Sequence, residues 1–408
     1  MPTSKFDIEK ELKSPVEEIS IIKLVDAAIN YAYESRASDI HIDPAENKIS
    51  VRFRIDGVMQ EAFSLPKEIH SEVISRIKVL SGLRTDEHHV AQDGRFKFTT
   101  SDKKTRFDVR VSIVPTYYEE NAVFRILAEQ GLGFTLKDIG FSSKDLGKMQ
   151  KAIQKPYGMI LATGPTGSGK TTSLYTVLRD LNTPDISIIT IEDPIEYSLE
   201  RVNQIQVNNQ TGLTFANGLR SILRQDPNII MVGEIRDEET AGIAVNAALT
   251  GHLLLSTLHT NDASTTLPRL LDMKVEPFLI ASTVNVAIGQ RLVRKICPDC
   301  KEKKKYSIAS LGLLSSAITP KVLGSNDTFY FGKGCKTCNM SGYKGRLGIY
   351  EVLEVSEAIR EAIVGHMVAS EIKKIAVHEG MTTMLEDGFQ KVLQGITTIE
   401  EIVRVIYE

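Results

Sequence analysis

The sequence predicts an α/β protein in which a small α+β domain precedes a larger domain built on a parallel sheet. In the later part of the chain, short and almost continuously apolar runs alternate with helix-compatible stretches, as in a parallel sheet covered on both faces. In the first third, apolar and polar residues alternate strictly, which indicates half-buried strands. A glycine-rich loop also stands between an apolar run and a helical stretch, as in phosphate-binding proteins.

The composition is that of an ordinary globular protein and excludes several other classes. A length of 408 residues predicts two or three domains, and 42% hydrophobic with 25% charged residues excludes collagen-like, disordered and coiled-coil chains. The net charge of -3 shows no basic excess for nucleic acid, so no nucleic-acid partner is expected. No apolar run approaches the roughly 18–20 residues of a membrane span, so any membrane role is predicted to be peripheral.

The first predicted domain covers residues 15–130, after a polar and frayed start. Apolar residues recur at helical spacing from Pro15 to Arg36, and the period then changes to two in the strand Ile49–Ile55. A second helix is predicted from Pro66 to Leu80. Two further strands are predicted at Arg95–Phe98 and Phe107–Val114, which completes a compact α+β domain.

The second predicted domain covers residues 138–408 and follows a linker at 131–137, where two glycines loosen the chain. A cysteine-containing subdomain is predicted to interrupt it at 290–350, and the tail from Ile359 to Tyr407 has a helical period. Its buried strands are predicted at 158–163, 186–192, 228–232 and 252–257.

The glycine-rich loop predicts a nucleotide site. The segment GPTGSGKT matches G-x-x-x-x-G-K-[ST] without a mismatch, and its strand–loop–helix context disfavours a chance glycine-rich turn. Lys170 would reach the β- and γ-phosphates of ATP, and Thr171 would hold Mg²⁺. The predicted nucleotide-binding residues are Gly164, Pro165, Thr166, Gly167, Ser168, Gly169, Lys170, Thr171 and Thr172.

Carboxylates at two predicted strand ends are candidates for activating water. Glu234 follows one apolar run, with Gly233 in the place where an aspartate is usual. Glu192 ends another strand, in a segment that also contains Glu196. Such an acid beside the γ-phosphate can orient or deprotonate water. The alternative is a solvated loop charge, which is favoured for Glu196.

Two histidines and four arginines are candidates for contact with phosphate. His252 precedes and His259 follows one buried run; a γ-phosphate contact and an ordinary structural role are equally supported for His259, and position alone favours His252 less. Arg220 and Arg224 are spaced to share one face of a predicted helix. Strand arginines usually face solvent, but in a domain packed over the nucleotide they would neutralise charge, which makes candidates of Arg110 and Arg125.

The four cysteines form two C-x-x-C pairs, and two such pairs complete a tetrahedral site for structural Zn²⁺. Redox activity is the alternative, although one isolated pair would suit it better. The predicted ligands are Cys297, Cys300, Cys335 and Cys338.

Together these residues resemble the ATPases of type II secretion and type IV pilus assembly. The resemblance runs from about Pro15 to the end of the chain. It rests on motifs in a fixed order: SDIH at 38–41, the phosphate-binding loop, IEDPIEY at 191–197, LRQDPNIIMVGEIRD at 223–237, TGHLLLSTLHTND at 250–262, and the cysteine pairs.

The resemblance implies a RecA-like ATPase domain behind a PAS-like domain, arranged as a homo-hexamer at the cytoplasmic face of the bacterial inner membrane. Such a motor hydrolyses ATP to drive assembly of pilins or pseudopilins, with an inner-membrane platform protein as partner. The resemblance does not choose between the two systems. Assembly motors generally carry a further N-terminal domain, so the chain is expected to be truncated or naturally short.

The resemblance also implies roles for single residues. Glu234 corresponds to the catalytic Walker B glutamate, and Glu192 to a glutamate that positions water or metal. His252 and His259 fall in the histidine box of the family. Arg110 and Arg125 correspond to arginines of the N-terminal domain that help complete a nucleotide site, and Arg220 and Arg224 match a helix pair of the family pattern. The four cysteines correspond to the zinc subdomain of assembly motors, which retraction motors typically lack.

One segment of the chain departs from the family pattern. This segment is Tyr118–Asn121, where the family usually has a glycine before the glutamate.

Two other functions also remain open from the sequence: a nucleic-acid translocase with a zinc-ribbon module, and a non-motor NTPase or kinase. DNA-stimulated turnover would favour the translocase, and full turnover by a monomer would favour the non-motor enzyme.

Overall fold

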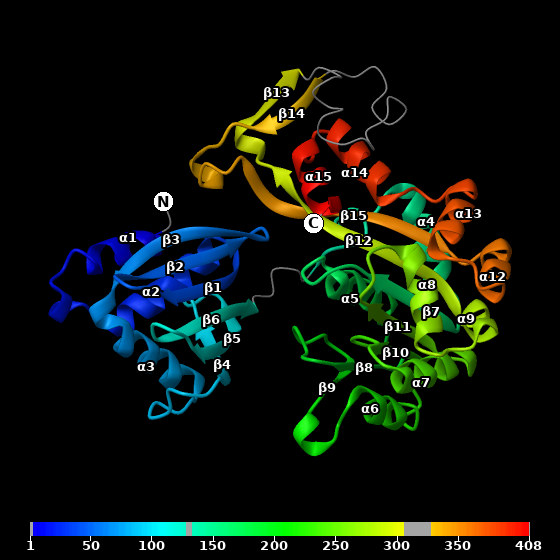
Figure 1. Cartoon of the computed structure of the whole chain (residues 1–408), viewed down its shortest axis with the longest axis horizontal. Coiled ribbons are helices and arrows are strands. Elements are labelled where there is room, and N and C mark those ends of the chain that lie inside the picture. The colour runs from blue at the N-terminus through cyan, green and yellow to red at the C-terminus, as the bar shows by residue number, and fades with distance from the viewer. Residues whose placement is uncertain (1–2, 128–132, 306–327, 408) are drawn as a thin grey trace. The chain divides into compact units, whose positions relative to one another are not determined.

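The computed structural model describes residues 3–127, 133–305 and 328–407, and the chain forms two compact units, Met1–Leu132 and Gly133–Glu408 (Figure 1). The predicted linker at 131–137 and the predicted subdomain at 290–350 lie partly outside the described residues. Within the described residues, no helix is long and apolar enough to cross a membrane.

The first unit is a six-stranded antiparallel sheet with helices packed on one face. The strand order is β3-β2-β1-β6-β5-β4. Along β2, Ile49, Val51 and Phe53 are buried while the residues between them are more exposed, which is the alternation read from the sequence. The elements are α1 (Thr3–Glu11), α2 (Ile21–Glu34), β1 (Ala37–Pro44), β2 (Lys48–Ile55), β3 (Val58–Pro66), α3 (His70–Ser81), β4 (Gln92–Thr99), β5 (Arg106–Pro115) and β6 (Glu120–Leu127), with short 3-10 turns at Val16–Glu18 and Lys67–Ile69.

The start of this unit differs from the expectation of a frayed segment. Residues Thr3–Glu11 form helix α1, which packs against α2 and buries Ile8. The sequence pattern missed this helix because one buried isoleucine among charged residues creates almost no apolar stripe.

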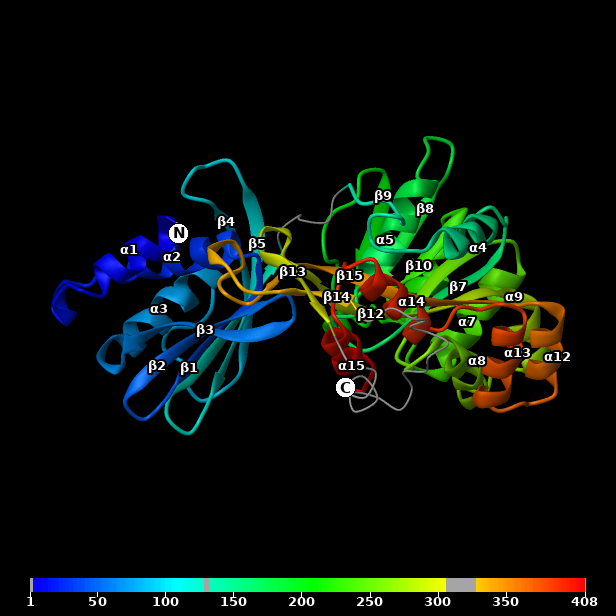
Figure 2. The ribbon, with the colours of Figure 1, turned by 90° about the horizontal axis from the view of Figure 1, so that it is seen from above.

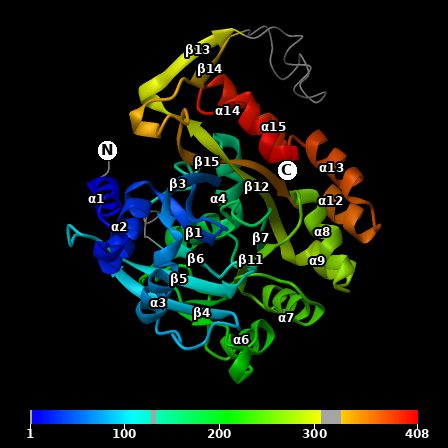
Figure 3. The same ribbon diagram turned by 60° about the vertical axis from the view of Figure 1, so that its left-hand side comes forward.

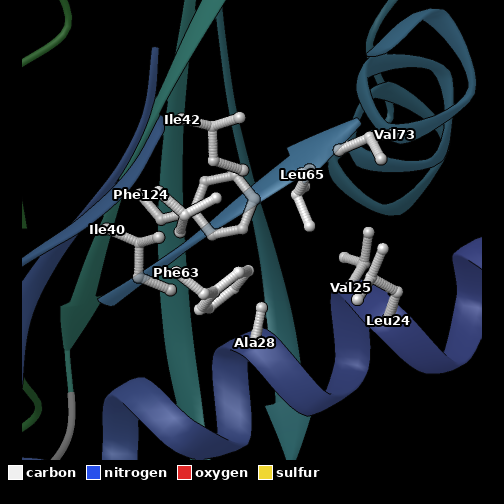
Figure 4. A pocket seen from close by; sticks show the side chains of 10 residues that line it. Leu24, Val25, Ala28, Ile40, Ile42, Phe63, Leu65, Val73 and Phe124 are labelled. Atoms are coloured by element: carbon white, nitrogen blue, oxygen red, sulfur yellow. The ribbon is translucent and has the colours of Figure 1, made fainter. Parts of the chain in front are cut away.

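The core of the first unit is densely packed. Figure 4 shows side chains of α2 and α3 meeting those of the sheet, with Phe63 and Phe124 between them. The lining is wholly apolar, and the space left is about 10 Å³. That volume is at the lower limit for one water molecule. This cavity is therefore too small for a small-molecule ligand.

The second unit is a seven-stranded sheet of order β15-β12-β7-β11-β10-β8-β9. All neighbouring strands are parallel except β12 and β15. The predicted buried strands correspond to β7 (Gly158–Thr163), β8 (Ile188–Glu192), β10 (Ile229–Val232) and β11 (Leu253–Leu258). The parallel α/β class predicted for this part of the chain is thereby confirmed, while β9 (Val202–Gln206) was not predicted.

Helices cover both faces of this sheet, as Figure 2 shows for α5 on one side and α7 and α8 on the other. A core beneath α6 to α9, α12 and α13 fills one face, and a second core beneath α4 and α5 fills the other. The helices are α4 (Ser143–Ile153), α5 (Lys170–Leu181), α6 (Phe215–Ile222), α7 (Glu238–Leu249), α8 (Ala263–Asp272), α9 (Pro277–Thr283), α12 (Glu357–Val364) and α13 (Ala369–His378).

A smaller third core supports the cysteine-containing part. Strands β12 (Val284–Ile296) and β15 (Tyr343–Glu354) extend beyond the main sheet, and helices α14 (Met384–Leu393) and α15 (Ile399–Tyr407) pack on them around Phe389 and Val293. A two-stranded ribbon continues from this region beside α14 (Figure 3). Its strands are β13 (Lys301–Lys305) and β14 (Thr328–Gly332).

Candidate active site

The phosphate-binding loop lies between the end of β7 and the start of α5. Gly167 and Gly169 have φ angles of +79° and +87°, a region that favours glycine, so the loop can turn its N–H groups toward one point. The first free N–H groups of α5 lie at the same place and add the partial positive charge of the helix terminus. The loop therefore has the geometry of an anion cradle.

Lys170, the first residue of α5, is folded over this loop. Its Nζ donates hydrogen bonds to the carbonyl oxygens of Gly164 at 2.6 Å and Pro165 at 3.1 Å. Burial lowers the pKa of Lys170 to about 8; nearby Arg291 also lowers it, while the charge of Glu234 opposes the change. A buried ammonium that donates its hydrogen bonds to neutral carbonyls is well suited to bind a phosphate.

Strand β12 supports the loop from the neighbouring position in the sheet. The buried Gln290 side chain donates from Nε2 to the Ser168 carbonyl at 2.8 Å. A Cβ at Gly164 would lie 2.5 Å from the Gln290 carbonyl oxygen, so a larger residue does not fit there. Gln290 was not predicted from the sequence, because no local motif shows that β12 pairs with β7.

Glu234 and His259 meet at the carboxyl ends of β10 and β11. Glu234 is 8% exposed, and its Oε2 lies 2.9 Å from Nε2 of His259. Arg236 forms an ion pair with the other carboxylate oxygen. The Thr257 hydroxyl donates to the Gly233 carbonyl at 2.7 Å and holds the exit of β10 in place. The fold thus brings together two of the predicted catalytic residues, Glu234 and His259. It also adds Arg236, which was not predicted, although its position two residues after Glu234 in the sequence could have indicated it.

Glu192 has different surroundings. It is buried at the end of β8. Among the described residues, its carboxylate accepts hydrogen bonds from the hydroxyl of Tyr175, from Thr190 Oγ1 at 2.5 Å and from Gln204 Nε2 at 3.2 Å. Burial raises the pKa of Glu192 above the ordinary value of a glutamate. Its carboxylate is thus held by residues of β8, β9 and α5.

His252 and His259 lie at opposite ends of β11 (Leu253–Leu258) within one chain. His252 precedes β11 and His259 follows it, so a six-residue strand of about 20 Å separates them. His252 Nδ1 lies 2.9 Å from the carbonyl oxygen of Ala247, at the end of the sheet opposite the loop. The two histidines stand at the two ends of one strand in the sequence. Because the strand is extended, His252 lies far from the site when His259 lies in it.

The predicted arginines occupy two places. Arg220 lies in α6 and forms an ion pair with Glu239 at 2.7 Å, and Arg224, just beyond the helix, donates to the Arg220 carbonyl. Arg110 and Arg125 are direct register partners on β5 and β6 of the first unit. Arg125 Nε lies 3.1 Å from Oδ1 of Asp39, in the SDIH segment.

The four cysteines gather as predicted from their spacing. Their sulfur atoms lie within 4.8 Å of one another, with separations of 3.9, 3.9 and 3.7 Å for 297–335, 300–338 and 335–338. A tetrahedral Zn²⁺ with bonds of about 2.3 Å requires sulfur atoms about 3.8 Å apart, so the donor set fits. Burial opposes ionisation of Cys338, but N–H groups of Cys335 and Gly342 outweigh it and lower the pKa of that thiol to about 7.

The fold and this site define the class of protein: a P-loop nucleoside triphosphatase with a strand-end glutamate beside the loop. Residues 15–404 match the family described as "Type II/IV secretion system protein". The chain belongs to this family, as its resemblance predicted.

Curated relatives agree with this assignment. The chain is 44% identical over 393 residues to "Type IV pilus assembly ATPase PilB" of Myxococcus xanthus, covering 96% of this chain and 69% of the relative. It is 46% identical over 403 residues to "Type II secretion system protein E" of Xanthomonas campestris pv. campestris, covering 99% and 70%. It spans 44% of a Thermus thermophilus PilB, at 46% identity over 98% of this chain. The interpretation of the sequence as a secretion or pilus-assembly ATPase is confirmed.

Solved structures share the fold. The pilus retraction motor PilT with bound ADP matches with a TM-score of 0.62 and 28% identity, over 93% of this chain and 96% of that one. The Legionella pneumophila ATPase DotB matches with a TM-score of 0.68 over 94% and 95% of the two chains, and at 23% identity it supports the fold alone.

Proposed function

We propose that the chain is the ATP-hydrolysing subunit of a homo-hexameric motor that assembles pilins or pseudopilins at the cytoplasmic face of an inner membrane. The observation that carries the proposal is the meeting of Glu234 and His259 at the strand ends, on the side where Lys170 closes over the phosphate loop. The zinc-compatible cysteine cluster supports an assembly motor over a retraction motor. The PAS-like character of the first unit and a platform protein as partner belong to the same proposal.

The residues present fit ATP and Mg²⁺. In the proposed reaction, Lys170 exchanges its loop carbonyls for phosphate oxygens, and the hydroxyl of Thr171 is the ligand that this chain offers to Mg²⁺. When bound, Mg²⁺ would neutralise charge on the β- and γ-phosphates. Glu234 accepts a proton from water as the water oxygen bonds to the γ-phosphorus and the bond to the β-phosphate oxygen breaks. His259 holds the carboxylate in place through its contact with Oε2 of Glu234.

The remaining predicted residues take supporting roles in this proposal. Glu192 acts through Tyr175. Arg220 and Arg224 lie on the α6 side of the second unit, and the arginines of the first unit complete a site in the assembled ring. The cysteine cluster holds Zn²⁺ in a structural role.

Two experiments test the proposal. The full chain should hydrolyse ATP in a Mg²⁺-dependent manner and form hexamers, and Lys170→Ala should abolish ATP binding. Deletion of the gene in its host, with surface pili and secreted enzymes scored separately, should remove one of the two, and the lost process identifies the system. Full turnover by a strictly monomeric protein, with pili and secretion both intact after deletion, would refute the motor function.

A further inference from the structure

A buried carboxylate close to the site has no part in the mechanism above. Glu351 lies on β15 opposite Gly289 of β12, and its side chain is 1% exposed. Its Oε1 accepts a hydrogen bond from the N–H of Ala263 at 2.8 Å, and its Oε2 accepts one from the N–H of Met384 at 3.3 Å. These are the first residues of α8 and α14, where helices have free N–H groups and favour negative charge. One carboxylate therefore joins the starts of two helices.

Lys373 of α13 adds a third helix to this cluster. Its Nζ lies 3.1 Å from Oδ2 of Asp262 and 3.7 Å from Oε2 of Glu351. Burial lowers the pKa of Lys373, but the two carboxylates outweigh burial and raise it above the ordinary value. Asp262 is the N-cap of α8 and accepts from the N–H of Thr265 at 2.8 Å. The start of α8 is thus held by charged contacts to α13 and β15.

The absence of a side chain at Gly289 leaves the space that this contact needs. A Cβ at that position would lie 2.9 Å from the nitrogen of Ala263, and 2.9 Å from both Cγ and Oε1 of Glu351. These distances are too short for any side chain larger than hydrogen without movement of the carboxylate or the helix. Glycine at this position therefore permits the hydrogen bond between β15 and α8.

Helix α8 begins directly after the loop that carries His259. The other end of this loop is anchored by Thr163, the last residue of β7, whose hydroxyl accepts from the N–H of Thr260 at 3.0 Å and donates to its carbonyl at 2.8 Å. The loop at 259–262 is therefore held at one end by the phosphate-loop strand and at the other by Glu351. His259 directly precedes the anchored Thr260, and its Nε2 lies 2.9 Å from Oε2 of Glu234.

We propose that Glu351 is a positioning residue for ATP hydrolysis: through the start of α8 it sets the geometry of His259 and Glu234, and it ties that geometry to helices α13 and α14. This inference rests on the proposed function. A displacement of the C-terminal helices would reach the site through this carboxylate, because it is the group that α8, α13 and α14 share.

The test uses the full chain with Glu351→Gln, which keeps the shape of the side chain but removes its charge and replaces one of its two acceptor oxygens with an NH₂ group. We expect kcat to fall about tenfold while KM for ATP changes by less than about twofold, since the loop shifts but the phosphate cradle does not. Gly289→Ala should reproduce this split by pushing the carboxylate away from Ala263. The matched control is Glu357→Gln, an exposed acid in α12 paired with Arg360, which should leave both constants unchanged.

A double-mutant cycle separates positioning from a general loss of structure. In a His259→Ala background, Glu351→Gln should lower kcat by less than about twofold, because the side chain that links the start of α8 to Glu234 is absent. A full tenfold loss in that background would overturn the proposal, and so would an unchanged kcat in the folded single variant.

Two further results complete the test. If Glu351→Gln does not fold, Gly289→Ala and Lys373→Met carry the same measurement, and the proposal stands or falls with their kcat. An absence of ATP turnover in the wild type is a different result, since it would overturn the proposed function and this inference with it.

Discussion

Replacing Glu234 with glutamine tests the centre of the site with almost no change in volume. The substitution removes the negative charge of Glu234, a residue that is 8% exposed. Its Oε2 lies 2.9 Å from Nε2 of His259, and its other carboxylate oxygen forms an ion pair with Arg236. A positioned general base contributes about 10²–10⁴-fold to a rate. At about 1.36 kcal/mol for each factor of ten, the barrier should rise by about 3–5 kcal/mol. We therefore expect kcat to fall by about 10²–10⁴-fold.

Nucleotide binding should survive this change, because the phosphate cradle consists of the loop and Lys170. The charge of Glu234 raises the pKa of Lys170, so its removal should move that pKa further below about 8. The variant should therefore begin to lose ATP affinity at a lower pH than the wild type, which is a signature that damage to the fold would not produce.

The assays are phosphate release at saturating ATP and Mg²⁺, binding of a fluorescent ATP analogue, and size-exclusion chromatography. Glu238→Gln is the matched control, since Glu238 is a largely exposed acid in α7 paired with Lys274. The control should hydrolyse ATP at the wild-type rate. A kcat of Glu234→Gln within twofold of the wild type would refute the assignment of the general base.

Three further predictions use the same preparation. Cys335→Ser should release one bound Zn²⁺ per chain and destabilise the region around the cysteines while nucleotide binding persists, since metal binding and folding are coupled; a wild type without metal by elemental analysis would contradict this. ATP affinity should be constant up to about pH 8 and fall above it, because Lys170, with its pKa lowered to about 8, must then gain a proton on binding. Calorimetry in two buffers should show proton uptake at high pH, and an ATP affinity that stays constant up to pH 10 would contradict this prediction. His259→Ala should lower kcat at least about tenfold, whereas His252→Ala should mainly cost stability, about 1 kcal/mol for one lost hydrogen bond; equal losses of kcat would contradict the separation of the two histidines.

The parts of the site that are contiguous in sequence were predictable from it. The phosphate loop, its flanking strand and Lys170 lie within one segment, and the four predicted strands of the second unit match β7, β8, β10 and β11 closely. A buried parallel strand needs an apolar run with turn residues at both ends, and this local pattern is visible without any tertiary structure. The cysteine cluster was predictable for a related reason, because the ligand spacing of each pair is set by the metal.

Other features depended on which strands became neighbours. Glu234 and His259 are 25 residues apart, and they meet because β10 and β11 are adjacent and parallel, so that both carboxyl ends reach the same edge. The length of β11, which runs between the two histidines, places His252 at the other end of the sheet. Gln290 and Glu351 were missed because their partners lie on other strands and helices, and their local sequence contains no motif.

By itself, therefore, the sequence determined the class of this protein, its phosphate loop, its metal-compatible cysteines and its family, because each depends on residues at short and fixed spacing. Only the tertiary structure decided which charged groups share the site, that Lys170 is held by backbone carbonyls, and that Glu351 joins α8 to the C-terminal helices. The physical reason is that hydrogen bonds and charges act over a few ångströms in space, and strand order brings residues that are distant in sequence within that range.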